Sequence, residues 1–296
     1  MYNDVFALNI YGLVNYFQGN IEKARTIFIE AINLDSNYLD SYNNLGKIYI
    51  DFENLNEAFQ NFKKAYKINK KNPNTLINIG NILSLKDKNN FAIKAYEKAL
   101  KNSDKKNEIL ANISITYSRM KIINLALKYY NKCIELNYIN PSLELSISYL
   151  YLYKNRFYDG WNLFESRIQI NKFFKKNCSP ELISHINKCN KKINKKSKVL
   201  VLREQGLGEE ILFSSIYEDL LNYCENVTIE ADPRLIKIFE RSFNKKIFVK
   251  SGKYSMDPIK IKKFDTVIFA GSLCKTFRKN LNNFHKKKYL ISDKNK

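Results

Sequence analysis

Residues 39–72, LDSYNNLGKIYIDFENLNEAFQNFKKAYKINKKN, contain the spacing that decides the fold of the first half of the chain. Small and aromatic residues of this stretch return every 34 positions along the sequence. The four series are Gly12, Gly46, Gly80, Ser114 and Ser148; Ala24, Ala58, Ala92, Ala126 and Gly160; Phe28, Phe62, Tyr96, Tyr130 and Phe164; and Ala31, Ala65, Ala99 and Cys133, which Arg167 interrupts. Four series that hold their spacing without an insertion indicate a repeat architecture.

Each period predicts a pair of helices, because its apolar residues follow helical spacing and turn residues such as Gly19 and Asn54 separate the two halves. The glycine of the first helix is expected to let the second helix approach closely, while the aromatic residue fills the gap between neighbouring hairpins. Trp161 is expected to cover the open end of the stack, with Glu165 and Arg167 making that end polar. The five predicted repeats are 5–38, 39–72, 73–106, 107–140 and 141–174.

Stacked helical hairpins form a solenoid whose first helices line a concave groove. Asn44, Asn78 and Asn112 occupy the same position in three successive repeats, and a row of side-chain amides can hydrogen-bond an extended peptide backbone. The repeats resemble tetratricopeptide repeats from Val5 to Phe174, and the amide row is similar to the asparagine ladder of O-linked N-acetylglucosamine transferase. That resemblance implies a protein or peptide partner in the groove. The alternative is chance, since the chain contains 39 asparagines.

The net charge of +21 invites a nucleic-acid interpretation, but its distribution argues against one. Residues 172–198 carry +8 and residues 275–296 carry +7, so the rest of the chain is only slightly basic. Of the 50 basic residues, 42 are Lys and eight are Arg, whereas Arg is the residue suited to reading guanine and phosphate. Weak contact with an anionic membrane surface or an anionic substrate is an equally good explanation.

Five scattered cysteines without a C-x-x-C pair, together with two histidines, argue against a zinc site and predict no metal and no cofactor. The odd number of cysteines suggests reduced thiols and hence a cytoplasmic protein. No apolar run reaches the length of about 18–20 residues that a membrane helix needs, and the amino terminus lacks the basic and apolar segments of a secretory signal.

After a basic connector at 175–197, with an expected short helix from Pro180 to Cys189, the pattern changes to alternating strands and helices. This alternation predicts a parallel sheet of the doubly wound type at 198–296, so the fold class is an α-solenoid (1–174) followed by an α/β half-domain. The expected strands are 198–203, 226–231, 246–250 and 264–270, and the expected helices begin near Glu209 and Pro233.

The loop after the first strand is the natural ligand position of such a sheet. Its members are Glu204, Gln205, Gly206, Leu207 and Gly208, followed by Glu209. Backbone amides at a helix start favour anions, yet G-x-G alone is a weak signal and the acidic residues of the loop are expected to repel a phosphate. Glu209 is either a general base or a favourable charge in the first helical turn.

The chain resembles bacterial tetratricopeptide-repeat proteins that carry a glycosyltransferase domain similar to the lipopolysaccharide heptosyltransferases. The resemblance lies in three segments: the run from Leu202 to Phe213, Asp232-Pro233-Arg234-Leu235, and Tyr158-Asp159-Gly160-Trp161. The resemblance implies a GT-B fold made of two Rossmann-like halves, with a carboxylate acting as base toward the acceptor hydroxyl. Glu209 stands where the family has Asp, and the extra methylene moves the carboxylate by about 1–1.5 Å, a displacement that can cost about a hundredfold in rate.

About 100 residues follow Lys198, enough for one Rossmann-like half. We therefore expect a truncated or split product with exposed apolar surface near Ile211, Leu273 and Phe277.

Two functions remain open, and with them whether the chain is an enzyme. The first is a protein that binds a peptide or protein partner in its groove and lacks the donor-binding half needed for transfer. The second is a glycosyltransferase toward a protein or glycan acceptor, using a nucleotide-sugar when a partner chain or downstream product supplies the second half.

Overall fold

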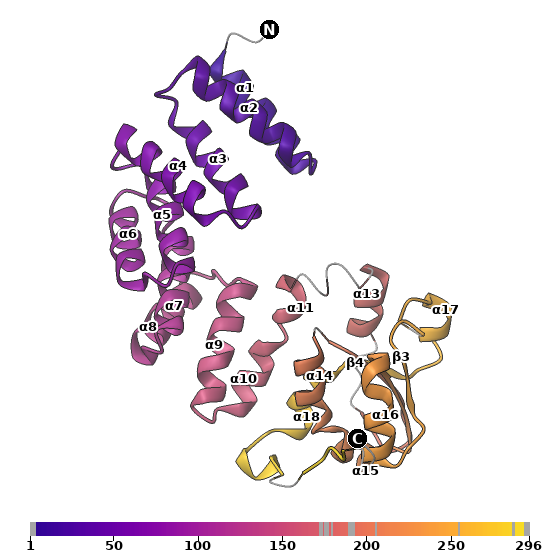
Figure 1. Cartoon of the computed structure of the whole chain (residues 1–296). Coiled ribbons are helices and arrows are strands. Elements are labelled where there is room, and N and C mark those ends of the chain that lie inside the picture. Colours follow the sequence, from indigo (N-terminus) through magenta and orange to yellow (C-terminus); the bar gives the residue numbers. More distant parts are fainter. Residues whose placement is uncertain are drawn as a thin grey trace. The chain divides into compact units, whose positions relative to one another are not determined.

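The computed structural model describes residues 4–171, 174, 178, 180–188, 193–204, 206–253, 255–285 and 288–292. The chain divides into two compact units, Met1–Ile139 and Asn140–Lys296 (Figure 1). The first unit is entirely helical, and the second combines helices with a small parallel sheet. Both the helical repeats and the parallel sheet expected from the sequence are therefore present.

The first unit consists of four helical hairpins in sequence order. Within this unit the second helix of each hairpin contacts the first helix of the next, so the hairpins form a continuous stack (Figure 1). The helices are α1 (Val5–Phe17), α2 (Ile21–Leu34), α3 (Leu39–Asp51), α4 (Leu55–Ile68), α5 (Pro73–Leu85), α6 (Asn89–Lys101), α7 (Lys106–Arg119) and α8 (Ile123–Glu135).

A residue with left-handed backbone follows the first helix of every hairpin at the same 34-residue interval. These residues are Gly19, Glu53, Asp87, Lys121 and Asn155, with φ between 56° and 83°. A left-handed residue stops a helix and reverses the chain, which explains why the turns are short and equal in length. Only the first of these turns uses glycine, the residue that adopts this conformation without steric cost.

The small and aromatic series meet inside the first three hairpins. The same rings also pack against the next hairpin, as expected from the sequence, because Phe28 shares a core with Leu45 and Ile48, and Phe62 shares one with Ile82. A Cβ atom added to Gly46 would clash with the ring of Phe62, and one added to Gly80 would clash with the ring of Tyr96. The ring lies flat against the glycine because no side chain intervenes. Phe62 is fully buried as a result, together with Ala58 and Ala65 of the same helix.

The fifth predicted repeat forms the expected helical pair, α9 (Pro141–Tyr153) and α10 (Phe157–Phe164), but this pair lies in the second compact unit. The expected solenoid boundary at 174 and the compact-unit boundary at 139 therefore differ. The reason is packing: Phe164 and Trp161 of α10 belong to the same apolar core as Val199 and Val201 of the sheet. Trp161, expected to cover an open end of the stack, also donates its indole N–H to the carbonyl of Arg278 at 2.8 Å.

Among the described residues, four parallel strands form the sheet in the order β3-β2-β1-β4. Every pairing is parallel, with Val199 opposite Val227 of β2 and opposite Thr266 of β4. Alternate residues of β1 enter two separate cores, Val199 and Val201 on one face and Leu200 and Leu202 on the other. Both faces are thus buried, as in sheets covered by helices on each side. The strands are β1 (Lys198–Leu202), β2 (Asn226–Ala231), β3 (Phe248–Lys250) and β4 (Thr266–Phe269).

The remaining elements include the predicted helices, one of which is divided, together with short helices that the sequence did not predict. The single helix expected from Glu209 to Tyr223 is broken at residues 215 and 216, where Ser215 Oγ donates to the Leu212 carbonyl at 2.7 Å and competes with the helical pattern. The predicted helices are α13 (Pro180–Lys188), α14 (Leu207–Ser214), α15 (Tyr217–Tyr223) and α16 (Pro233–Phe243), and the short helices that the sequence did not predict are α11 (Arg167–Ile170), α17 (Pro258–Ile261), α18 (Cys274–Phe277) and the 3₁₀ helices η1 (Ala270–Leu273) and η2 (Leu281–Asn283).

The apolar surface expected on this unit is present only in part. Leu273 is fully buried in the core that also contains Phe213, so the expectation for this residue was wrong. Phe277 is partly buried and packs edge-on against Tyr223, with ring centroids 5.9 Å apart. Ile211 is exposed, as is its neighbour Leu212.

Candidate functional site

Asn44, Asn78 and Asn112 lie at the same position of the helices α3, α5 and α7, as the 34-residue spacing predicted. Asn44 and Asn112 are half-buried, whereas Asn78 is buried at 9 % exposure. The Asn44 amide donates to Asn9 Oδ1 at 3.0 Å, and the Asn78 amide donates to Asn43 Oδ1 at 3.3 Å. Asn44 and Asn78 are therefore held by residues of the preceding hairpin and are not freely rotating.

A second amide row, which the sequence analysis missed, provides these contacts. Asn9 and Asn43 are 4 % exposed and precede the predicted row by one position in their repeats. Ser41 Oγ donates to Asn9 Oδ1 at 3.4 Å, and the Asn43 amide donates to Thr75 Oγ1 at 2.9 Å. Their own 34-residue spacing was the signal that could have revealed them. A side-chain amide offers two donor hydrogens and an accepting oxygen, so Asn44 keeps hydrogen-bonding capacity after its contact with Asn9.

Two further contacts tie the carboxyl ends of the same first helices together. The Tyr16 hydroxyl donates to Asp51 Oδ2 at 2.7 Å, and Arg119 Nη1 donates to Ser84 Oγ at 3.0 Å. Burial, reinforced by the Asp51 carboxylate, raises the pKa of Tyr16 to about 12. These polar links join successive first helices across the hairpins of the first unit, which fixes their spacing.

In the second unit, the predicted loop follows β1 and leads into α14. Gln205 lies outside the described residues, while Gly206 is the residue that precedes the helix and Leu207 is its first residue. The Gly206 N–H donates to Glu209 Oε2 at 3.2 Å, so the half-buried Glu209 carboxylate caps the first turn of α14. Gly208 is exposed, and a Cβ there would meet no atom within 4 Å.

Glu204 occupies a different environment from the rest of the loop, because it is fully buried and paired with Arg167. Arg167 donates from Nε to Glu204 Oε2 at 2.9 Å and from Nη2 to Glu204 Oε1 at 2.8 Å. The Gly271 N–H donates to the same carboxylate. These three hydrogen bonds occupy Glu204, which leaves it a structural anchor between α11, β1 and η1 instead of a group that faces a ligand.

Arg167, which the sequence analysis placed on a polar end of the stack, is only 1 % exposed. Its Nη1 contacts Glu165 Oε1 at 2.8 Å, its Nη2 donates to Ser272 Oγ at 2.9 Å, and Ser272 Oγ in turn donates to Glu165 Oε2 at 2.9 Å. Burial alone opposes the charge of Arg167, but the carboxylates of Glu204 and Glu165 hold its pKa above the ordinary value. The charge is compensated entirely within the second unit.

A second charged cluster lies at the carboxyl ends of β1 and β2, where parallel sheets place ligands. Arg203 Nε lies 3.1 Å from Glu210 Oε2, and Arg203 Nη1 lies 3.2 Å from Asp232 Oδ2. Glu210 Oε1 accepts the Asp232 N–H at 2.7 Å. Arg234 Nε donates to Asp232 Oδ1 at 2.8 Å, and hydrogen bonds from Arg234 hold the pKa of Asp232 well below its usual range.

Two of the acidic residues near this loop, which was expected to repel a phosphate, are paired with arginines. Glu204 is neutralised by Arg167 and Glu210 by Arg203, because the low-dielectric interior requires a buried carboxylate to have a partner. Burial still raises the pKa of Glu210. Glu209 is the acidic residue of this loop that faces solvent in part.

Tyr217 lies in the apolar core of the second unit and offers a direct test of its packing. Its side chain is fully buried against Phe239, Phe243 and Phe248, and its hydroxyl has no hydrogen-bond partner among the described residues. An unsatisfied buried hydroxyl costs about 1–3 kcal/mol. We therefore expect Tyr217→Phe to raise the free energy of unfolding of the second unit by about 1 kcal/mol, measured by urea denaturation.

The matched control is Tyr96→Phe in the first unit. The Tyr96 hydroxyl donates to Asn81 Oδ1 at 2.7 Å, so its removal should lower stability by about 1 kcal/mol. A loss of stability in Tyr217→Phe equal to that of Tyr96→Phe would show that the Tyr217 hydroxyl is hydrogen-bonded.

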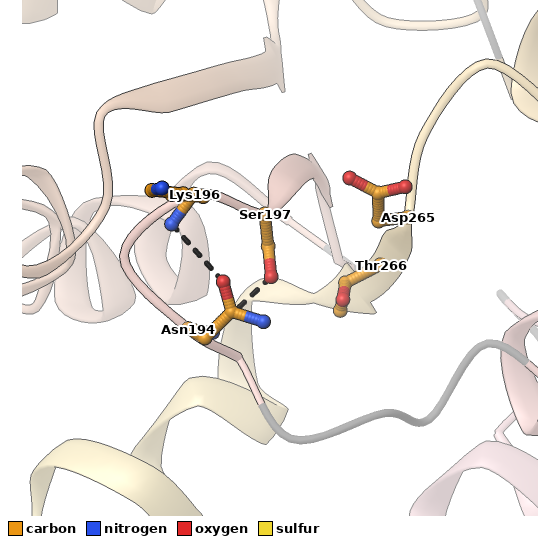
Figure 2. Close-up of a pocket in the computed structure, with 5 residues that line it drawn as sticks. All are labelled: Asn194, Lys196, Ser197, Asp265 and Thr266. Carbon is orange, nitrogen blue, oxygen red and sulfur yellow. Dashed lines mark hydrogen bonds between the residues drawn. The ribbon is translucent and has the colours of Figure 1, made fainter.

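A pocket of about 310 Å³ lies at the opposite edge of the sheet, at the amino ends of β1 and β4 (Figure 2). Ser197 Oγ accepts the Asn194 N–H at 3.2 Å, and Asn194 Oδ1 accepts the Lys196 N–H at 3.0 Å (Figure 2). These bonds stabilise the turn that enters β1. Ligands of open parallel sheets bind beyond the carboxyl ends of the strands, so this pocket is not the site that the sheet topology predicts.

The described part of the chain contains no group of three His, Cys, Asp or Glu residues that could hold a metal ion. No helix among the described residues combines the length and apolar character needed to cross a membrane. The described cysteines Cys133, Cys178, Cys224 and Cys274 are free thiols, and burial raises the pKa of both Cys133 and Cys178 to about 11.

Comparison with known proteins identifies the repeats. Residues 39–72 and 108–140 match the tetratricopeptide-repeat family model, so the chain contains tetratricopeptide repeats. No curated protein matches the sequence.

Solved structures are similar in fold at low sequence identity. The type IV pilus biogenesis factor PilW has a TM-score of 0.52 at 14 % identity, with 56 % of this chain and 76 % of that chain covered. The pilF protein of Pseudomonas aeruginosa has a TM-score of 0.49 at 19 % identity, covering 62 % and 80 %. YrrB, described as a tetratricopeptide-repeat protein with an unusual peptide-binding site, has a TM-score of 0.44 at 18 % identity, covering 57 % and 87 %. The likeness to PilW supports the helical-repeat fold alone.

Proposed function

We propose that the protein binds an extended peptide, or an extended segment of a partner protein, along the first helices of its tetratricopeptide repeats. The observation that carries this proposal is the amide row of Asn44, Asn78 and Asn112, held at one position of three successive first helices. Side-chain amides can pair with both the N–H and the C=O groups of a peptide, so they bind backbone without selecting its sequence. Sequence preference would then come from the residues around the row.

Preorganisation supports the same proposal. The buried amides of Asn9 and Asn43 accept hydrogen bonds from Asn44 and Asn78, which restricts rotation of two members of the row before a peptide arrives. Groups that are already ordered lose less conformational entropy on binding. The row itself is uncharged, so we expect its affinity to depend weakly on salt.

The test is peptide binding by the full chain, first on an array of random-sequence peptides and then by calorimetry with the best binder. Combined replacement of Asn44, Asn78 and Asn112 by Ala should weaken binding roughly a hundredfold, since each lost hydrogen bond contributes about 1 kcal/mol. The matched control replaces Asn90, Asn124 and Asn131, three exposed residues of second helices, by Ala and should leave the affinity unchanged. Equal affinity of the two triple variants would contradict the proposal.

A second candidate function, glycosyl transfer, is favoured by Glu209. We propose that the sheet unit is related to the acceptor-binding half of a GT-B glycosyltransferase, completed by a second half from a partner chain or a downstream product. Its support is the half-buried Glu209 carboxylate beside the open Gly208, past the carboxyl end of a parallel strand. In that reaction the carboxylate would take the proton of the acceptor hydroxyl while the hydroxyl oxygen bonds to the anomeric carbon, and the nucleoside diphosphate would leave.

This candidate is tested by incubating the purified chain with nucleotide-sugars, alone and together with the downstream product that would supply the second half, and measuring release of nucleoside diphosphate. Turnover that is lost in Glu209→Gln and retained in Glu209→Asp would establish it, because Asp preserves the carboxylate. Glu209→Gln also keeps a group able to accept from the Gly206 N–H, so a folding defect would not explain the loss. No release above the level without protein would leave peptide binding as the function of the chain by itself.

A further inference from the structure

Helix α1 exposes a large amount of apolar surface. Its thirteen residues contain no charged side chain, and large apolar groups are exposed along its length. The exposures are 60 % for Phe6, 44 % for Ile10, 41 % for Tyr11, 44 % for Val14 and 81 % for Phe17. Contiguous exposed apolar surface of this kind marks an interaction site, so the exposed face of α1 is a candidate interface.

Four of its residues, which define the seam, are Phe6, Ile10, Leu13 and Phe17; Phe6, Ile10 and Phe17 are exposed, while Leu13 is partly buried against the core that contains Phe28. Their spacing of 4, 3 and 4 positions is that of the core positions in a pair of packed helices. The corresponding residues of α3, 34 positions later, are all polar: Asp40, Asn44, Lys47 and Asp51. The seam is therefore specific to α1 and is not imposed by the repeat itself.

The seam is self-complementary under a two-fold rotation. When two copies of α1 lie antiparallel, centred between Tyr11 and Gly12, Phe6 faces Phe17 of the second copy and Ile10 faces its Leu13. A two-fold interface requires this kind of match between a surface and itself. α1 itself carries no charged side chain, and the ammonium group of Lys23 lies beside the seam, with Nζ 5.1 Å from the centroid of the Tyr11 ring.

Two residues beside the seam, Tyr11 and Val14, occupy positions that form an interface between hairpins elsewhere in the stack. Tyr11 and Val14 correspond to Leu45 and Ile48 of α3, which are buried in a core with Phe28 of the preceding hairpin. In α1 the same positions are open. Taking about 200 Å² for a large side chain, the exposed fractions of Phe6, Ile10 and Phe17 give about 370 Å² per copy. Pairing of the seam therefore buries about 700 Å² in total, the size of a weak contact that forms only at high protein concentration.

We propose that α1 is a dimerisation helix, and that two copies of this chain associate through antiparallel pairing of the seam. The test measures self-association of the full chain by sedimentation equilibrium over a wide concentration range. The wild-type chain is expected to form a concentration-dependent dimer. Phe6→Glu and Phe17→Lys should each weaken dimerisation about tenfold or more, whereas Phe91→Lys, at an equally exposed phenylalanine of α6, should leave it unchanged.

Mixing the Phe6→Glu and Phe17→Lys variants tests the register of the pair. In the mixed dimer the carboxylate introduced at position 6 of one copy would face the ammonium group introduced at position 17 of the other, while the second Phe6–Phe17 contact stays intact. The mixture is therefore expected to dimerise at least about tenfold more tightly than either variant alone. Unchanged helical content and melting temperature in both variants show that the exposed sites were altered without unfolding.

Three results would overturn the proposal. The first is a wild-type chain that stays monomeric throughout the range, and the second is a dimer equally weakened by Phe91→Lys. The third is a mixture no tighter than its components, which would exclude this pairing. An extended peptide that binds the wild-type monomer and loses affinity in Phe17→Lys would assign the seam to peptide binding instead.

Discussion

Replacing Arg167 by Met should lower the free energy of unfolding of the second unit by about 3–5 kcal/mol. The substitution leaves Glu204 fully buried without the guanidinium that compensates its charge. The Gly271 N–H alone cannot replace the two hydrogen bonds from Arg167. Urea denaturation followed by the fluorescence of Trp161, the only tryptophan of the chain, reports this transition because the indole packs in the same unit.

Two further variants distinguish the stability lost with the buried Arg167–Glu204 pair from the stability lost on removing any arginine. Arg156→Met removes a half-exposed arginine that pairs with Asp159 at 2.8 Å in the same hairpin, and it should cost less than about 1 kcal/mol. The double variant Arg167→Met with Glu204→Leu should recover much of the loss, since apolar replacement of a buried ion pair is often nearly neutral. A stability of Arg167→Met equal to that of Arg156→Met would contradict the anchoring role.

Phe62→Ala should destabilise the first unit by about 3–5 kcal/mol. Phe62 is fully buried and its ring covers Gly46, so its removal leaves a cavity inside the second hairpin. The loss is measured by urea denaturation followed by far-ultraviolet circular dichroism. Phe91→Ala, at a phenylalanine that is 62 % exposed, should change stability by less than about 0.5 kcal/mol.

Substitution of Gly46, the glycine opposite the Phe62 ring, tests this packing, because its effect on stability should depend on whether the ring is present. In the wild-type chain Gly46→Ala should destabilise by about 1–3 kcal/mol, because the added methyl group clashes with Phe62. In the Phe62→Ala background the same methyl group enters the cavity, so Gly46→Ala should cost less or become favourable. Additive effects of the two substitutions would show that the ring and the glycine are not in contact.

The local features of the fold were predictable because they depend on residues close in sequence. The 34-residue spacing located the helices of every hairpin, and the turn residues Glu53 and Asp87 lie where the left-handed backbone occurs. The alternation after Lys198 located all four strands, since each is an apolar run between turn residues. The position of the amide row followed from the same spacing.

The features that sequence reasoning missed depend on contacts between distant residues. Arg167 was interpreted as a break in the Ala series, and its partners Glu204 and Ser272 are 37 and 105 positions away. Nothing in the local pattern distinguishes a buried arginine from an exposed one. Glu204 was predicted to belong to a ligand loop for the same reason, because its partner Arg167 is distant in sequence. The contact of Trp161 with Arg278 was also missed, since it spans 117 positions.

The candidate sites show the same division. The position of Glu209 in the first turn of a helix followed from the G-x-G turn, but the pairing of Glu210 with Arg203 required the fold. The amides of Asn9 and Asn43 lie one position from the predicted row, and their role as buried partners depends on how successive first helices pack. Whether a residue supports the site or can contact a ligand depends on its burial in the folded chain.

Hydrogen–deuterium exchange of the intact chain, compared between wild type and Arg167→Met, tests most directly whether the fifth hairpin is part of the sheet unit. We expect protection to fall together in α9, α10, β1 and β4, with no change in α1 to α6. Loss of protection in α9 and α10 that leaves β1 and β4 at their wild-type rates would contradict a shared folding unit anchored by Arg167 and Glu204.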